Sequence, residues 1–237
     1  TDFALPQSVI EVFRRGEGLS IVTGSRASGK STLAQELIEK VSASGISATA
    51  LIVDDEIGAD FTDTALFSSE LFIKNINIVR GFDFVVIDST MASAWRMAVQ
   101  LAETGVRVLL ILPFANIETA LYRLSEKIEA QPNLGMSRIV HVLQVALALK
   151  MAISFDQKVQ PVFELLFATA EIKQAMLNNQ WQVIDEYVQV QGEKTGMRTM
   201  NQSILSLMLK RKIDLKSGFS VSPSPVELDK MLEKVGF

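Results

Sequence analysis

Gly24-Ser25-Arg26-Ala27-Ser28-Gly29-Lys30-Ser31 is the stretch of sequence that decides the fold. Its spacing is that of a phosphate-binding loop, in which two glycines permit a tight turn whose backbone N–H groups face an anion. The apolar run at 18–23 predicts a buried strand before the loop, and apolar residues at helical spacing predict a helix over 30–42. Strand, loop and helix in this order predict binding of a nucleoside triphosphate. The flanking pattern disfavours the alternative, a chance glycine turn before a helix.

The loop predicts a separate task for each of its polar side chains. Lys30 is placed to reach the β- and γ-phosphates, and the hydroxyl of Ser31 is placed to bind Mg²⁺. The predicted cofactor-binding residues are Gly24, Ser25, Arg26, Ala27, Ser28, Gly29, Lys30, Ser31 and Thr32.

Two acidic strand ends are candidates for the remaining chemistry. Phe84-Val85-Val86-Ile87-Asp88 is an apolar run that ends in a carboxylate, which predicts that Asp88 is the Walker-B acid and a Mg²⁺ ligand with Ser31. Asp54-Asp55-Glu56 ends another strand, and carboxyl ends of strands face the ligand crevice of α/β sheets. Two interpretations of this acidic cluster stay open. Either one of its carboxylates orients water or metal, or the cluster is a solvated strand end. The predicted catalytic residues are Asp54, Asp55 and Asp88.

Few residues of this chain could serve as a transition-state cation, as zinc ligands or as a Cys/His catalytic pair. Arg80 and Arg26 are candidates for the cation that contacts the phosphates in the transition state. The alternative for each is a surface charge without a role in catalysis. His141 lies in an apolar stretch that favours a satisfied strand histidine. One histidine and no cysteine exclude a Cys/His mechanism, and they leave almost nothing for a zinc site.

Composition predicts a globular protein. The 237 residues are 48% hydrophobic, and no apolar run is long enough to cross a bilayer, so no membrane insertion is expected. A secretory signal is not visible at the start. The net charge of −4 comes without a basic stripe, which disfavours nucleic-acid binding.

The pattern along the chain predicts a three-layer α/β fold, with a mostly parallel sheet flanked by helices. Two apolar stretches between 138 and 169 predict a β-hairpin that turns at 154–158. The later residues predict a small helical C-terminal extension. We therefore expect a nucleotide-binding core at 1–169 and a helical subdomain at 170–237. The other predicted strands are 48–54, 84–88 and 106–112, and the other predicted helices are 92–103, 117–129, 172–178, 201–212 and 225–234.

Four segments resemble the type IV pilus retraction ATPases, within the wider type II/IV secretion ATPase superfamily. They are Arg15–Gly24, which leads into the loop; Ala102-Glu103-Thr104-Gly105; Phe163–Thr169; and Gly196-Met197-Arg198-Thr199-Met200-Asn201-Gln202-Ser203, the most specific of them.

The resemblance implies a RecA-like P-loop fold that corresponds to the C-terminal domain of that family, without its N-terminal PAS-like domain. It implies ATP and Mg²⁺ as cofactors, and ATP hydrolysis that drives pilus or secretion machinery, as in twitching motility. It also implies a homo-hexamer that works with an inner-membrane platform protein, in the cytoplasm and peripheral to the inner membrane.

Departures from the family pattern concern catalysis. Asp88 stands where the family has glutamate, and Thr90-Met91 replaces an Arg-Asp pair. The acidic box is matched only loosely at 53–58, and the family's histidines are absent at 112–114 and at Val106. These changes favour an alternative function, a hydrolysis-impaired paralogue that binds nucleotide as a structural or regulatory subunit. A DNA-dependent ATPase is disfavoured by the absence of a basic stripe.

Overall fold

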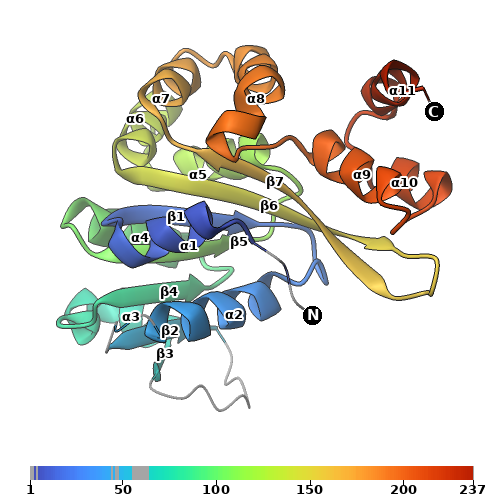
Figure 1. The fold of residues 1–237 in the computed structure, drawn as a ribbon. Coiled ribbons are helices and arrows are strands. Elements are labelled where there is room, and N and C mark those ends of the chain that lie inside the picture. The colour runs from blue at the N-terminus through green and yellow to red at the C-terminus, as the bar shows by residue number, and fades with distance from the viewer. Residues whose placement is uncertain (1–2, 4, 44, 46–47, 55–63, 237) are drawn as a thin grey trace.

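A seven-stranded sheet forms the centre of the molecule, with helices on both faces (Figure 1). The computed structural model describes residues 3, 5–43, 45, 48–54 and 64–236. The strand order is β3-β2-β4-β5-β1-β6-β7, and every neighbouring pair is parallel except β6 and β7. The predicted fold class is therefore confirmed.

Most predicted elements are present, with small differences at their ends. The strands are β1 Gly18–Thr23, β2 Thr49–Val53, β3 Thr64–Ser68, β4 Phe84–Asp88, β5 Arg107–Leu112, β6 Leu143–Ile153 and β7 Val159–Phe167. The helices are α1 Gln7–Arg15, α2 Lys30–Ser42, α3 Ser69–Lys74, α4 Ala92–Glu103, α5 Ile117–Ile128, α6 Pro132–Val142, α7 Ala170–Leu177, α8 Trp181–Thr195, α9 Met200–Leu209, α10 Leu215–Val221 and α11 Pro225–Lys234, with a 3-10 turn, η1, at Ile76–Val79.

Alternating side chains of the central strands fill two separate cores. In β4, Phe84 and Val86 pack toward α1 and α2, whereas Val85 and Ile87 belong to the larger core on the opposite face. The four side chains have no exposed surface. Burial on both faces explains why these strands are continuous apolar runs in the sequence.

Seven elements of the structure were not predicted from the sequence. They are helices α1, α3, α6, α8 and α10, the 3-10 turn η1 and the edge strand β3. The expectation that His141 is a strand histidine was wrong, because this residue lies exposed in the last turn of α6. Strand β6 begins at Leu143, directly after the helix ends, so the apolar run around His141 spans two elements.

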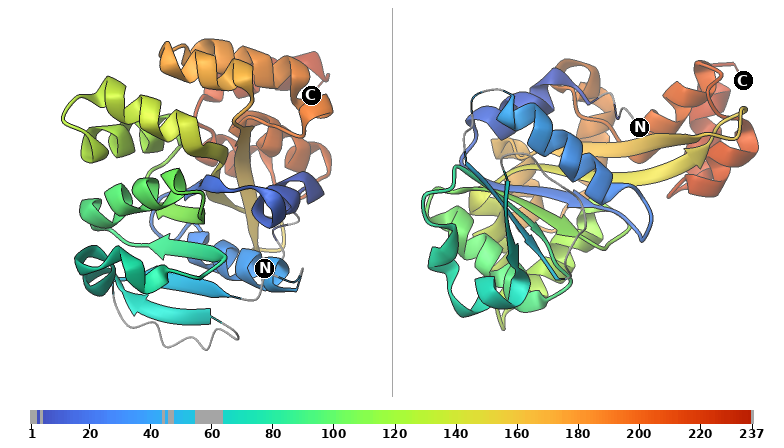
Figure 2. Two further views of the ribbon diagram at one scale, coloured as in Figure 1. Left: turned by 90° about the vertical axis from the view of Figure 1, so that its left-hand side faces the viewer. Right: turned by 90° about the horizontal axis from the view of Figure 1, so that it is seen from below.

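A long hairpin carries the C-terminal helices. Strands β6 and β7 project beyond the rest of the sheet, and α9 and α10 lie along them (Figure 2). The predicted turn is confirmed, because the N–H of Ser154 donates to the carbonyl of Lys158 at 2.8 Å. Leu165 pairs with Arg198 on the opposite side of β7 from β6. The division of the chain at 169/170 stays a prediction.

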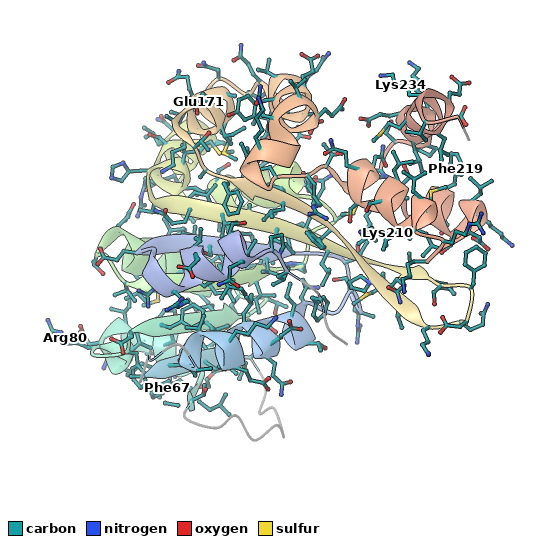
Figure 3. All side chains as sticks on the ribbon, viewed as in Figure 1. Phe67, Arg80, Glu171, Lys210, Phe219 and Lys234 are labelled. Atoms are coloured by element: carbon teal, nitrogen blue, oxygen red, sulfur yellow. The ribbon has the colours of Figure 1, made fainter. Side chains whose placement is uncertain are left out.

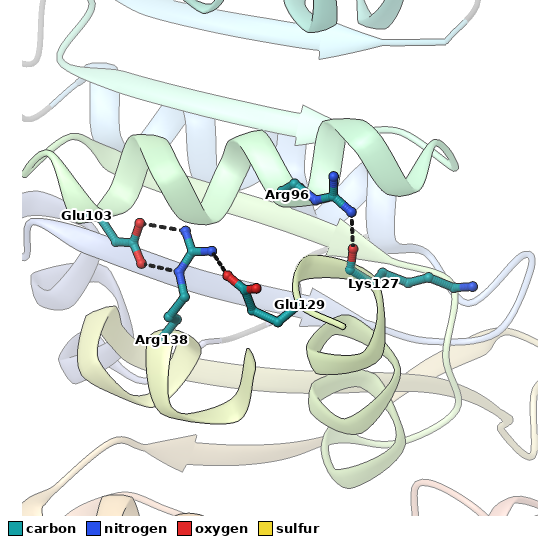
Figure 4. A network of polar contacts seen from close by, with 5 residues as sticks. All are labelled: Arg96, Glu103, Lys127, Glu129 and Arg138. Atoms are coloured by element: carbon teal, nitrogen blue, oxygen red, sulfur yellow. Dashed lines mark hydrogen bonds and ion pairs between the residues drawn. The ribbon is translucent and has the colours of Figure 1, made fainter. Parts of the chain in front are cut away.

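An ion-pair cluster joins three helices on one face of the sheet (Figure 4). Arg138 of α6 donates to both carboxylate oxygens of Glu103, at the end of α4, with N–O distances of 2.8 Å. It also pairs with Glu129, just after α5. Hydrogen bonds from Arg138 hold the pKa of Glu103 below its ordinary value. The shared guanidinium fixes α4, α5 and α6 relative to one another.

Cationic side chains are spread over the molecule. Arg80 lies at one end of the molecule, whereas Lys210 and Lys234 lie on the C-terminal helices at the other (Figure 3). Lys210, Arg211 and Lys212 are exposed after the end of α9, as expected for a solvated helix end. In the part of the chain that the structure describes, no helix has the length and apolar character needed to cross a membrane.

Candidate functional site

The phosphate-loop sequence forms a tight turn between β1 and α2. A Cβ atom on Gly24 would lie 2.6 Å from the carbonyl oxygen of Leu149 and 2.3 Å from the hydroxyl of Ser28, so only glycine fits. Gly29 has φ +85°, a left-handed conformation that favours glycine. Helix α2 begins at Lys30, and among the described residues no side chain caps its first turn. Its N–H groups remain available to an anion.

The hydroxyl of Ser28 supports the same interpretation. Ser28 is 6% exposed, and its Oγ has no hydrogen-bond partner among the described residues. A buried hydroxyl without a partner costs free energy, so such groups usually meet a ligand or water. The unpartnered hydroxyl and the glycine-only turn fit a bound phosphate chain.

Lys30 folds back onto the loop that precedes it. Its Nζ donates to the carbonyl oxygen of Ser25 at 2.8 Å. Burial lowers the pKa of Lys30, and the nearby charge of Asp88 opposes that effect. A carbonyl is a weaker partner for an ammonium than a phosphate oxygen is, so an arriving phosphate exchanges a neutral acceptor for a charged one.

Ser31 and Asp88 form the oxygen pair predicted for Mg²⁺. The hydroxyl of Ser31, in the first turn of α2, donates to Oδ2 of Asp88 at 3.0 Å. In the sheet, β5 lies between β4, which ends at Asp88, and β1, which precedes the loop. Burial raises the pKa of Asp88, which the hydrogen bond from Ser31 and the charge of Lys30 partly offset. Among the described residues no three His, Cys, Asp or Glu side chains are grouped to hold a metal. A Mg²⁺ ion here would need further oxygens from nucleotide and water.

Asp54 is held by the residues that follow Asp88. Its Oδ1 accepts from the hydroxyl of Ser89 at 2.5 Å, and its Oδ2 accepts from Thr90 through both the backbone N–H at 2.7 Å and the hydroxyl at 2.6 Å. Burial alone would raise the pKa of Asp54, but these hydrogen bonds lower it below its ordinary value. The third predicted carboxylate, Asp55, lies outside the described residues.

The sequence prediction missed an aromatic pair behind the acidic residues. The indole Nε1 of Trp95 donates to the carbonyl of Ser89 at 2.7 Å. Its ring meets Phe114 edge-on, with the centroids 5.8 Å apart. Phe114 exchanges two hydrogen bonds with Thr23, the last residue before the phosphate loop. The aromatic pair therefore connects the strand that bears Asp88 to the base of the loop.

The remaining candidates lie elsewhere or point outward. Arg80 precedes β4 at its amino end, whereas Asp88 ends that strand at its carboxyl end, so Arg80 is far from the loop. Arg26 is exposed on the loop itself, and Ser25 and Thr32 are exposed as well. His141 lies on α6 and takes no part in the site.

Ala27 is strained within the loop, because its φ of +61° lies in the left-handed region. We expect Ala27→Gly to raise the free energy of unfolding by about 1 kcal/mol, or the melting temperature by roughly 2–4 °C. Ala43→Gly is the control, since Ala43 is exposed with φ −60° and should lose stability. If the melting temperatures of both variants changed in the same direction, the assignment of strain to Ala27 would be contradicted.

Comparisons with known proteins agree with this architecture. No protein-family model and no curated protein matches the chain. Among solved structures, the pilus retraction motor PilT with bound ADP aligns with a TM-score of 0.79 and 22% identity over 96% of this chain. The ATPase DotB of Legionella pneumophila aligns with a TM-score of 0.75 and 18% identity over 92%. The VirB11 ATPase of the Brucella suis type IV secretion system, in complex with sulphate, aligns at 0.53 and 13% over 72%.

These alignments cover only part of each neighbour. They span 67% of PilT, 63% of DotB and 55% of VirB11. At such low sequence identity the alignments show a shared fold and not a shared activity. The resemblance seen in the sequence is confirmed at that level: this chain has the fold shared by the pilus retraction motor PilT and the secretion ATPases DotB and VirB11.

Proposed function

We propose that the protein is an ATP-binding motor-type ATPase that couples ATP hydrolysis to the movement of pilus or secretion machinery. The observation that carries the proposal is the meeting of the glycine loop, its unpartnered Ser28 hydroxyl and the Ser31–Asp88 pair at one edge of the sheet. The fold shared with PilT and DotB supports the same class of activity.

Each residue of the proposed site has a separate role. Lys30 and the first N–H groups of α2 bind the β- and γ-phosphates. Ser31 and Asp88 hold Mg²⁺, which offsets the charge of the phosphates. Asp54 or Asp55 orients the attacking water. Because Arg80 is remote and Arg26 faces solvent, a neighbouring subunit would supply the cation that the transition state needs.

The proposed working form is a homo-hexamer that contacts a membrane-embedded platform protein from the cytoplasm, at the inner membrane. Light scattering with and without ATP measures the assembly state. A chain that includes any upstream domain and stays monomeric with ATP would contradict the hexamer while leaving nucleotide binding intact.

Steady-state phosphate release tests the proposed hydrolysis directly. The wild type should release phosphate from ATP in the presence of Mg²⁺, and Lys30→Ala should not. Calorimetry on the same samples measures ATP binding. A wild-type rate equal to that of Lys30→Ala, together with measurable ATP binding by the wild type, would exclude the motor and leave the hydrolysis-impaired paralogue.

The hydrogen bonds to Asp54 favour that second candidate, a nucleotide-binding subunit without turnover. A carboxylate that accepts three hydrogen bonds and has a lowered pKa is a weak base. If Asp54 nevertheless orients water, its position depends on Thr90.

Thr90→Val tests whether Asp54 orients the water, because it removes the hydroxyl donor to Asp54 and keeps the backbone N–H. In an active ATPase we expect phosphate release to fall about tenfold, since small displacements of catalytic groups are costly. ATP affinity should stay unchanged. Thr104→Val, at the far end of α4, is the matched control. An unchanged rate of phosphate release in Thr90→Val would show that Asp54 does not orient the attacking water.

A further inference from the structure

A cavity lies away from the candidate nucleotide site, where the C-terminal helices meet the sheet. Its volume is about 240 Å³, and it is open to solvent on one side. Residues of α5, β7, α8, α9 and α11 line it. Four of the lining side chains are carboxylates that come from four different elements: Glu118 of α5, Glu164 of β7, Asp185 of α8 and Glu227 of α11.

Glu164 is the innermost of these four carboxylates. It lies on β7 and lines the cavity together with Glu118 in the first turn of α5. Part of its surface faces the cavity, while the surrounding protein withdraws the carboxylate from bulk water. Burial and then the charge of Asp185 raise the pKa of Glu164 to about 7. The N–H of Ile117 and the charge of Lys150 lower it by less.

Asp185 also lines the cavity, and it keeps part of its surface exposed to solvent. Partial withdrawal from water and then the charges of Glu227 and Glu118 raise the pKa of Asp185 to about 6. None of the ion pairs among the described residues includes any of these carboxylates. Lys150 of β6 is the cation that acts on Glu164, but its ammonium donates to the carbonyl of Val221 at 2.9 Å.

One of these carboxylates, Glu227, ties three C-terminal helices together. Glu227 accepts from Gln189 of α8 at 2.7 Å and from Asn201 of α9 at 3.1 Å. Asn201 is 1% exposed, and it also donates to the carbonyl of Ser224. Neutral side chains of α9 thus complete a wall whose charged members are all acidic.

We propose that this carboxyl-lined cavity is a proton-operated latch between the C-terminal helices and the sheet. When Glu164 and Asp185 are protonated, the four elements pack closely around it. When both are ionised, four negative charges share one small cavity, and their repulsion loosens α8 and α11 from β7 and α5. The latch acts on a set of helices that the nucleotide loop does not touch, so it does not depend on the proposed function.

The pH dependence follows from the direction of the shifts. Both pKa values are higher in the folded protein than the ordinary values of 4.5 and 3.8, so folding favours the protonated forms. Stability from the cavity is greatest below the ordinary values and is lost as pH rises through about 6 and about 7. The latch is therefore closed at pH 5 and loosened at pH 8.

Glu164→Gln tests the latch by replacing the carboxylate with a neutral amide of the same shape. At pH 5 the variant and the wild type should melt within about 1 °C of each other. At pH 8 the variant should melt about 5 °C higher, because it cannot ionise. Glu186→Gln is the control, since Glu186 is exposed on the same helix as Asp185 and outside the cavity. The melting temperature of Glu186→Gln should equal that of the wild type at pH 5 and at pH 8.

Hydrogen–deuterium exchange of the wild type gives a test that needs no variant. After correction for the intrinsic rate at each pH, amides of α8 and α11 should lose roughly tenfold protection between pH 5 and pH 8, while those of β1 and β4 keep theirs. Asp185→Asn should reduce this loss. Equal protection of α8 and α11 at both values, or the same melting difference between Glu164→Gln and wild type at pH 5 and pH 8, would overturn the latch.

Discussion

Replacing Lys30 with alanine should weaken ATP binding about 100-fold. The ammonium is the one charged donor in the glycine loop besides the exposed Arg26, and its present partner is only the neutral carbonyl of Ser25. Hydrogen bonds to charged groups contribute about 1.5–3 kcal/mol each, which corresponds to about 10- to 100-fold in affinity. Lys30 is placed to contact two phosphates, so the upper end is expected. Isothermal titration calorimetry measures the loss.

The matched control for this prediction is Lys40→Ala, which removes the same charge from the same helix. Lys40 pairs with Glu36 rather than with the loop. It should bind ATP as the wild type does, and both variants should have near-native melting temperatures. Equal losses of affinity in the two variants would mean that the overall charge of α2, rather than a contact at the loop, holds the nucleotide.

Gly24→Ala should destabilise the protein by about 3 kcal/mol and abolish ATP binding. The added methyl group would lie 2.6 Å from the carbonyl oxygen of Leu149, a backbone atom of β6 that cannot rotate away. Relief of this overlap must move either the loop or β6. Overpacking of this kind typically costs 1–3 kcal/mol, occasionally more. Chemical denaturation measures the loss of stability.

Gly81→Ala is the comparison that isolates the steric effect. Gly81 has φ +93° and open space around its missing Cβ, so alanine there introduces backbone strain without a collision. It should cost about 1 kcal/mol and leave ATP binding intact. A Gly24→Ala protein that binds ATP normally would show that the loop tolerates a side chain and that its geometry is not specific for phosphate.

The phosphate loop and the strands beside it could be predicted from the sequence because their patterns are local. Gly24–Ser31 has a fixed spacing, and β4 is an apolar run that ends in Asp88. Strand β3 could not be predicted in this way. It lies at the edge of the sheet, its side chains are half-buried or exposed, and its three central residues are all apolar. An edge strand of this kind has no clear hydrophobic period.

Helix α6 was missed for a different reason. The helix ends at Val142 and β6 begins at Leu143, with no glycine, proline or polar turn between them. A continuous apolar run cannot be divided into helix and strand by periodicity alone. Here the packing of α6 against α5 and α7 decides where the helix ends.

The environment of Asp54 depends on contacts that no linear pattern contains. Strands β2 and β4 pair with Val53 opposite Asp88, which places Ser89 and Thr90 beside the end of β2. The sequence shows an acidic strand end at Asp54 and hydroxyl groups after Asp88. Only the register of the two strands shows that one satisfies the other.

The contact between Trp95 and Ser89 gives the protein a natural optical probe. The chain has two tryptophans, and the indole of Trp95 donates to the carbonyl next to Asp88, while Trp181 borders the carboxyl-lined cavity. Any shift of the end of β4 changes the hydrogen bond and the ring contact that set the emission of Trp95. In a Trp181→Phe background, fluorescence therefore follows the candidate nucleotide site without an added label. A Trp95→Phe background reads the distant cavity by the same means.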